Sequence, residues 1–238
     1  MPDQPAGFSP RRVELARRRA ALMERVERAA AAAGRRPAEL TVITVAKTFP
    51  ASDVALLHEM GVLDIGENRA QELASKVTAL QGMAGVPIRW HFIGQLQGNK
   101  ASLIGRECFA LHTLDREALV APLDRAAIRA GHTLEVFLQL SLDGDPQRGG
   151  IVEGEIGPLA DAVAARGGLR LAGLMAVPPL GAAPRPAFAR LRAVSERLRL
   201  THPGAGALSA GMSADLEDAV IEGATHLRVG TDLMGSRA

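Results

Sequence analysis

The sequence contains no tyrosine, one tryptophan and one cysteine among its 238 residues. The single cysteine, Cys108, cannot form an internal disulfide, which is typical of proteins from a reducing cytosol. The chain also lacks an apolar run of membrane-spanning length, and its first residues lack the apolar core of a signal peptide. We therefore expect a cytoplasmic protein that depends on neither disulfides nor a membrane.

Several motifs with well-known chemistry are missing as well. The six histidines are dispersed, and neither an HExxH motif nor a paired-cysteine spacing occurs, so no metal site is expected. The GxSxG elbow of hydrolases and the glycine-rich Walker loop are absent. The formal net charge is only +2, and the arginines form no basic stripe with interleaved aromatics, which argues against binding to nucleic acid.

The sequence does contain a regular alternation of short apolar strands and amphipathic helices. Hydrophobic residues make up 47% of the chain, as expected for a globular protein. Strands are predicted at residues 40–45, 63–65, 88–93, 109–112, 134–140 and 169–177, near residue 207, and at residues 226–229. Pro122 falls inside a helix predicted from Asp115 to Ala130, so that helix is either kinked or starts later.

Alternating βα units imply a parallel sheet, and eight of them in this length predict a (β/α)8 TIM barrel with an extra N-terminal helix. An open doubly wound sheet is the alternative. No linker or change of composition divides the chain, so residues 1–238 are predicted to form a single domain, with residues 1–9 disordered.

Function in a β/α barrel collects at the carboxyl ends of the strands. The polar residues predicted at those ends, with Met175 nearby, are Lys47, Asn68, His91, Ser209 and Arg228. Lys47 ends an otherwise apolar strand, where desolvation would lower its pKa and free the amine to attack an aldehyde. The alternative is a lysine that extends past the strand into solvent.

Residues 207–237 predict a strand, a helix and a second strand, with a turn of small residues after each strand. Ser213 stands where the N-cap of that helix is expected. Backbone N–H groups of such turns bind anions, so the segment predicts a phosphate site with donors at Ser209, Gly211, Ser213, Gly230 and Thr231. Ordinary turn and cap chemistry is the alternative. A phosphate site combined with a lysine at a strand end suggests pyridoxal 5'-phosphate (PLP).

Each of three other polar residues allows two interpretations of its role. Arg228, if it faces the barrel interior, is a fixed cation, or else it forms a salt bridge to Glu67 or Asp64. Asn68 either orients a ring hydroxyl or caps the following helix. His91, between Trp90 and Phe92, is either part of the pocket lining or a satisfied core histidine.

The order of these motifs resembles the pyridoxal phosphate homeostasis proteins. The matching segments are VAKT (45–48), GEN (66–68) with Gln71-Glu72, WHFIGQLQGNK (90–100), GLMA (173–176), LSAGMSAD (208–215), RVGT (228–231) and GSR (235–237). The resemblance covers nearly the whole chain from about residue 10. It implies a single-domain barrel like the N-terminal domain of alanine racemase, a fold-type III PLP protein.

The resemblance also implies which residues bind the cofactor. It implies PLP as a Schiff base on Lys47, the phosphate near Ser209, Ser213, Gly230 and Thr231, and Arg228 against the pyridine nitrogen. The full set of expected cofactor-binding residues is Lys47, Asn68, Met175, Ser209, Gly211, Met212, Ser213, Arg228, Gly230 and Thr231, with His91 lining the pocket. No catalytic residue is expected.

Beside a group that stays protonated, the pyridine nitrogen remains unprotonated, and PLP is then a weaker electron sink. Racemases of the alanine type also use a tyrosine as acid and base, and this chain has none. We therefore expect a non-catalytic PLP carrier that buffers the cofactor and delivers it to PLP-dependent apo-enzymes, acting as a monomer. The alternatives are a fold-type III PLP enzyme such as an amino-acid racemase, and a barrel enzyme that acts on a phosphorylated metabolite without PLP.

Overall fold

The structure, a computed structural model, describes residues 9–83, 85 and 87–235. Residues 1–8 of the segment expected to be disordered lie outside the described residues, as do Ser236 and Arg237 of the last motif.

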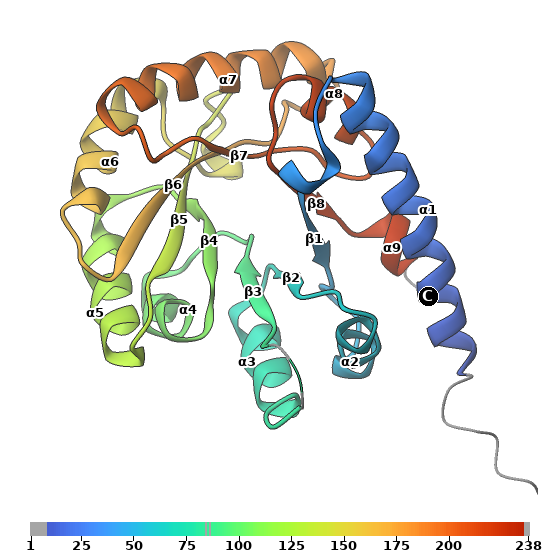
Figure 1. Ribbon diagram of the computed structural model, residues 1–238. Coiled ribbons are helices and arrows are strands. Elements are labelled where there is room, and N and C mark those ends of the chain that lie inside the picture. Colours follow the sequence, from blue (N-terminus) through green and yellow to red (C-terminus); the bar gives the residue numbers. More distant parts are fainter. Residues whose placement is uncertain (1–8, 84, 86, 236–238) are drawn as a thin grey trace, which may run out of the picture.

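Eight parallel strands form a closed barrel in chain order (Figure 1). They are β1 (Thr41–Val45), β2 (Asp64–Glu67), β3 (Arg89–Phe92), β4 (Ala110–Leu114), β5 (Leu134–Gln139), β6 (Leu169–Met175), β7 (Ala207–Ser209) and β8 (His226–Val229). The barrel closes where β1 pairs with β8, with Ile43 opposite Arg228. This closure confirms the predicted (β/α)8 barrel, and the doubly wound alternative is wrong.

Helices surround the barrel (Figure 1). They are α1 (Pro10–Ala32), α2 (Ala51–Glu59), α3 (Ala70–Ala79), α4 (Ala101–Glu107), α5 (Val120–Ala130), α6 (Ile156–Ala164), α7 (Pro184–Thr201), α8 (Leu216–Ile221) and α9 (Thr231–Met234). The extra N-terminal helix is α1, which begins after Ser9, whose hydroxyl accepts a hydrogen bond from the Arg12 N–H as an N-cap. It lies along α8 and α9, the last two helices of the chain.

The main hydrophobic core lies between the strands and the surrounding helices, and α1 contributes Leu15, Leu22 and Val26 to it. A smaller core lies inside the barrel, formed by Ala110, Phe137, Ala172 and Met175. Barrel interiors are usually filled by layers of large branched side chains. Two of the four residues here are alanines, and the interior also holds buried polar groups, including His91, His112 and Arg228.

The structure decides one local alternative and corrects one prediction. The helix predicted from Asp115 starts later rather than being kinked, because α5 starts at Val120 after a 3-10 turn (Glu117–Leu119), so Pro122 lies in the first turn of α5, where proline is tolerated. Ser213 is not the N-cap of α8: that position is held by Asp215, whose carboxylate accepts a hydrogen bond from the Met212 N–H instead (2.6 Å).

Candidate functional site

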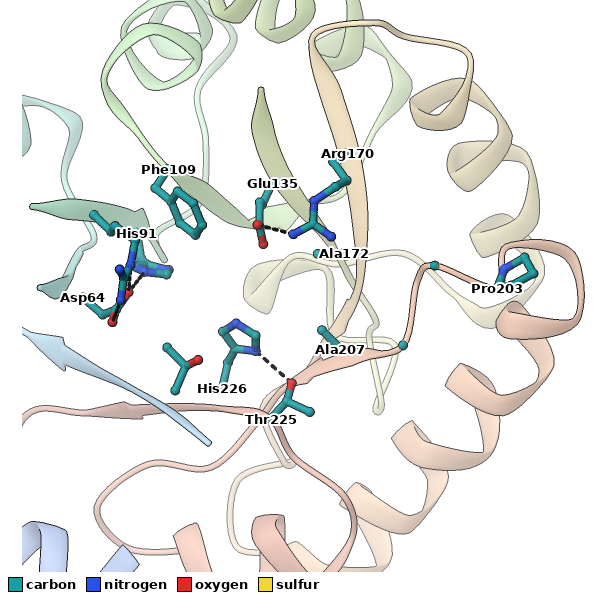
Figure 2. A pocket seen from close by; sticks show the side chains of 14 residues that line it. Asp64, His91, Phe109, Glu135, Arg170, Ala172, Pro203, Ala207, Thr225 and His226 are labelled. Atoms are coloured by element: carbon teal, nitrogen blue, oxygen red, sulfur yellow. Dashed lines mark hydrogen bonds and ion pairs between the residues drawn. The ribbon is translucent and has the colours of Figure 1, made fainter. Parts of the chain in front are cut away.

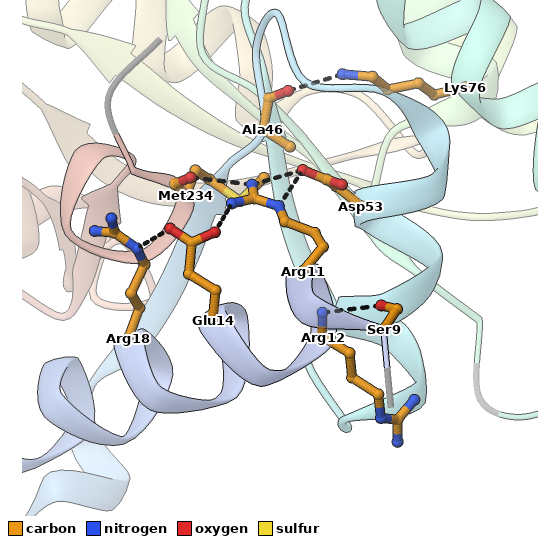
Figure 3. Close-up of polar contacts among 9 residues, drawn as sticks. All are labelled: Ser9, Arg11, Arg12, Glu14, Arg18, Ala46, Asp53, Lys76 and Met234. Carbon is orange, nitrogen blue, oxygen red and sulfur yellow. Dashed lines mark hydrogen bonds and ion pairs between the residues drawn. The ribbon is translucent and has the colours of Figure 1, made fainter. Parts of the chain in front are cut away.

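The sequence predicts Lys47 at the end of the first strand, but β1 ends at Val45 and Lys47 lies in the turn that follows, where it is partly buried. Its neighbours are tied down on both sides. The Ala46 carbonyl accepts a hydrogen bond from the Lys76 amine (2.8 Å; Figure 3), and the Thr48 N–H donates to the Glu72 carboxylate (3.1 Å). Thr48 has φ of 69°, a left-handed conformation that is costly for a β-branched residue. The backbone around Lys47 is therefore held in one conformation by side chains of α3.

The amine that holds Ala46 belongs to a buried ion pair between Lys76 and Glu67. The Glu67 side chain is fully buried and that of Lys76 is 7% exposed. Burial raises the pKa of Glu67 above its ordinary value, while the Lys76 ammonium acts in the opposite direction. The pair thus places two charged groups in the protein interior beside the turn that carries Lys47.

The two turns predicted to hold a phosphate lie next to each other. The Ser213 hydroxyl, in the loop after β7, accepts a long hydrogen bond from the N–H of Asp232 in α9 (3.4 Å). Arg25 of α1 joins the same two segments, because it donates to the Ser213 carbonyl (2.7 Å) and to the Asp232 carboxylate (2.6 Å). The turns are therefore fixed relative to each other by the N-terminal helix.

The second turn also lies beside the end of β1. A Cβ on Gly230 would lie 3.5 Å from the Val45 carbonyl oxygen, two residues before Lys47. Arg11 of α1 holds the end of α9 against α2: it donates to the Met234 carbonyl (3.0 Å) and to the Asp53 carboxylate (2.6 Å; Figure 3). The structure thus brings Lys47 and the Gly230–Thr231 turn to the same side of the barrel mouth.

Gly211 occupies a position that only glycine fits. Its φ is +90°, and a Cβ there would lie 2.6 Å from the Cβ of Ala219 in α8. The loop after β7 can therefore pack closely on α8. Met212, the next residue, is 38% exposed, and its side chain lies at the surface of the same loop.

Arg228 is buried and faces the barrel interior. It donates to the Ser209 hydroxyl (2.6 Å) and to the Ala176 carbonyl (3.1 Å). Ser209 and Met175 are register partners at the ends of β7 and β6, so Arg228 bonds to Ser209 near the carboxyl ends of the strands. Burial lowers the pKa of Arg228 to about 10, which leaves it a cation at neutral pH.

The salt bridge from Arg228 to Asp64 or Glu67, which the sequence left as an alternative, does not form. Asp64 pairs with Arg89 (2.5 Å) and bonds to His91, while Glu67 pairs with Lys76.

His91 is the satisfied core histidine that the sequence left as an alternative. It is fully buried, with Nδ1 bonded to His112 Nε2 (2.9 Å) and Nε2 bonded to the Asp64 carboxylate (2.9 Å). Sequence reasoning missed His112, although the strand alternation that faces Ala110 inward also faces His112 inward. His91 was expected at the carboxyl ends of the strands, but it borders a cavity at the opposite end.

That cavity has a volume of about 660 Å³ and lies at the amino-terminal ends of the strands (Figure 2). Its charged lining consists largely of ion pairs, Asp64 with Arg89 and Glu135 with Arg170. His226 also borders it, and its Nδ1 is bonded to the Thr225 hydroxyl (2.8 Å). In a β/α barrel, this end contributes mainly to stability.

Asn68 follows β2 and is partly buried. The N-cap of α3 is Arg69, so Asn68 is not its cap. A Cβ on Gly94 would lie 2.0 Å from the Asn68 carbonyl oxygen, so the loop after β3 contacts the Asn68 backbone at a distance that only glycine permits.

Gly94→Ala should therefore destabilise the protein and displace Asn68. Overpacking typically costs about 1–3 kcal/mol, and here the clash is with backbone, which cannot turn aside. Gly98→Ala is the matched control, because nothing lies within 4 Å of the Cβ that it adds in the same loop. Urea denaturation should show a lower midpoint for Gly94→Ala only; equal midpoints for the two variants would contradict the close approach.

The buried histidines predict acid sensitivity. Burial lowers the pKa of His226 to about 4 and that of His112 well below 6.5. Between about pH 6.5 and 4 the unfolded chain thus binds more protons than the folded one, so stability falls as the pH falls. For His226 alone the loss amounts to roughly 2–3 kcal/mol by pH 4.5. Urea denaturation at pH 7 and 4.5 measures it, and His226→Phe should reduce the difference; a wild-type stability independent of pH in this window would contradict the assignment.

No group of three or more histidine, cysteine or acidic side chains that could hold a metal ion occurs in residues 9–83, 85 and 87–235. Among the helices of the same described residues, none is both long and apolar enough to cross a membrane.

The eight parallel strands of this chain form a closed barrel. The family model for the alanine racemase N-terminal domain matches residues 18–238 of this chain. The fold and the family model thus define a barrel of the alanine racemase N-terminal type.

Comparison with similar proteins identifies the family within this class. A pyridoxal phosphate homeostasis protein of Mycobacterium tuberculosis is 40% identical over 98% of this chain and 96% of its own length. One from Pseudomonas aeruginosa is 41% identical over 90% of this chain and 91% of its own. The solved structure of PipY from Synechococcus elongatus with PLP bound is 32% identical, covers 88% of this chain and 99% of that one, and has a TM-score of 0.77. The chain belongs to the family of pyridoxal phosphate homeostasis proteins.

Proposed function

We propose that this protein binds PLP as a Schiff base on Lys47 and acts in intracellular PLP homeostasis, buffering the cofactor and delivering it to PLP-dependent apo-enzymes. PLP supplies an aldehyde carbon that reacts with an amine and a pyridine ring that withdraws electrons. The observation that carries the proposal is the meeting of three features at one barrel mouth: the turn with Lys47, the adjoining small-residue turns, and the buried Arg228 cation.

The residues present fit the cofactor. The backbone N–H groups of the Gly230–Thr231 turn and the loop around Ser213, tied together by Arg25, provide donors for a phosphate. In this proposal Gly211 and Met212 shape that loop, Met175 contacts the cofactor from the end of β6, and Asn68 would orient the ring hydroxyl. The Ser209 hydroxyl is already bonded to Arg228 and His112, so in this proposal it holds Arg228 rather than the phosphate.

We further propose that the protein is not an enzyme. Arg228 remains a cation at neutral pH, so a pyridine nitrogen beside it stays unprotonated and the ring is a weak electron sink. The chain also has no tyrosine that could act as the acid or base used by racemases of the alanine type. We propose that the protein acts in the cytoplasm and is a monomer, and light scattering on the purified protein tests the oligomeric state.

Two measurements test the function. The purified protein should acquire the absorption band of a PLP Schiff base on titration with PLP; a protein that stays colourless would contradict PLP binding. The loaded protein should not accelerate exchange of the α-hydrogen of amino acids in deuterated water. Rapid exchange with any one amino acid would instead support the alternative, a fold-type III enzyme such as a racemase, and would contradict the carrier.

A further inference from the structure

A continuous chain of hydrogen bonds crosses the barrel interior. Asp64 Oδ1 is bonded to His91 Nε2 (2.9 Å), and His91 Nδ1 is bonded to His112 Nε2 (2.9 Å). His112 Nδ1 is then bonded to Ser209 Oγ (2.8 Å), which accepts a hydrogen bond from Arg228 Nη1 (2.6 Å). The five residues come from five different strands, so the chain exists only because the barrel closes.

The two ends of this chain lie at opposite ends of the barrel. Asp64 is the first residue of β2 and borders the amino-terminal cavity, where Figure 2 shows it beside His91. Arg228 reaches the Ala176 carbonyl, just past the end of β6, on the side of the proposed PLP site. A carboxylate at one mouth is thus linked to the cation at the other.

The chemistry of the end groups sets the direction of the two outermost bonds. Arginine only donates, and the Asp64 carboxylate only accepts, since hydrogen bonds from His91 and Arg89 hold its pKa at about 2 against the opposing effect of burial. With both rings neutral, the two rings and the one hydroxyl between these ends each accept once and donate once. The arrangement that satisfies all of them has Ser209 donating to His112 Nδ1, and a proton on Nε2 of both histidines.

Water cannot replace these bonds. Ser209, His91 and His112 are each 0% exposed, and the His112 ring stacks on Phe137 with centroids 4.4 Å apart and planes at 9°. A partner removed from the chain would therefore leave a buried polar group without a hydrogen bond, which is costly. His226 touches the same Phe137 ring and borders the amino-terminal cavity, as Asp64 does. It bonds to Thr225, however, and takes no part in the series of hydrogen bonds from Asp64 to Arg228.

We propose that Asp64, His91 and His112 are positioning residues that fix Ser209 and thereby hold the Arg228 guanidinium toward the PLP site; the role of Arg228 toward PLP rests on the proposed function. The amino-terminal end of the barrel thus contributes to cofactor chemistry at the carboxyl end. Removing the Asp64 charge or the His112 ring nitrogens should loosen Arg228 without touching any residue of the PLP pocket other than Ser209.

The first test uses protein without PLP. Nitrogen NMR of the imidazole rings should show both His91 and His112 neutral and protonated on Nε2. Hydrogen exchange of the Arg228 guanidinium should be slow in the wild type. It should be about tenfold or more faster in His112→Phe, because Ser209 without its His112 partner no longer holds Arg228, and loss of one hydrogen bond to a charged group gives a change of that size. In Asp64→Asn the amide oxygen can still accept from His91, so the increase should be smaller. His226→Phe is the matched control and should leave the Arg228 exchange unchanged.

The second test uses protein loaded with PLP labelled with ¹⁵N in the ring. The pyridine nitrogen should be unprotonated in the wild type and in His226→Phe, and should shift toward the protonated value in His112→Phe and Asp64→Asn. Asp64→Asn preserves the shape of the side chain and keeps the test decisive if His112→Phe does not fold.

A proton on Nδ1 of either histidine, a doubly protonated His91, or unchanged Arg228 exchange in both variants would overturn the positioning role. Because these signals are measured without PLP, a negative result would not contradict the proposal that Lys47 binds PLP. Conversely, a protein that does not bind PLP would not contradict the hydrogen-bond chain.

Discussion

Lys47→Ala is expected to abolish covalent capture of PLP. The Schiff-base absorption band should be absent, and borohydride treatment should leave no cofactor attached to the protein, because the residue that supplies the amine is gone. Lys47→Arg should behave the same way, since a guanidinium keeps its proton and cannot act as the nucleophile. Absorption spectra recorded during a PLP titration, followed by reduction and removal of free cofactor, measure both effects.

The chain offers a sharp control, because it contains only three lysines, at positions 47, 76 and 100. Lys100 lies in a 3-10 turn (Gly98–Lys100) in the loop after β3, and Lys100→Ala should bind PLP like the wild type. A full-strength Schiff-base band in Lys47→Ala would show that another amine holds the cofactor, and the site would have to be reassigned.

Lys76→Met is expected to cause the largest loss of stability. It leaves Glu67 buried without its counter-charge, and breaking a buried pair in this way typically costs about 3–5 kcal/mol. One Glu67 oxygen, Oε2, already lacks a hydrogen-bond partner, so the carboxylate is incompletely satisfied even in the wild type. The Ala46 carbonyl would also lose its donor, which should loosen the turn that carries Lys47. Chemical denaturation measures the free energy of unfolding.

A double variant separates the cost of leaving the Glu67 charge unpaired from the cost of losing the Lys76 hydrogen bond to the Ala46 carbonyl. Glu67→Leu with Lys76→Met removes both charges and should recover most of the stability, because replacing a buried pair by apolar side chains is often neutral. Arg28→Ala breaks an exposed ion pair with Glu24 on α1 and should change stability by about 1 kcal/mol or less. If Lys76→Met were no more destabilising than Arg28→Ala, the buried pair would have no structural role.

Much of the fold could be predicted because it depends on local patterns. The apolar, β-branched run that ends before Lys47 became β1, and the run 134–140 became β5, because alternating βα units leave little choice of architecture. Helix starts were harder to predict. Ser213 and Asp215 are both good capping residues, and the choice between them depends on how the loop packs against α9.

The interior of the site could not be predicted from spacing. His112 and Ser209 are 97 positions apart, and they meet only because the closed barrel brings β4 and β7 to face each other across its axis. The same holds for Arg228, whose partners are Ser209 and the Ala176 carbonyl rather than the nearby carboxylates considered from the sequence. Strand alternation predicts which side chains point inward, but not which of them touch. The contacts of the site residues with PLP stay predictions.

The most direct measurement identifies the lysine that carries the cofactor. The wild-type protein is loaded with PLP, reduced with borohydride, digested and analysed by mass spectrometry. A single pyridoxyl-phosphate label on the peptide that contains Lys47 is the predicted result. A label on the peptide of Lys76 or Lys100, or no label on any of the three, would contradict the assignment of Lys47 as the covalent anchor.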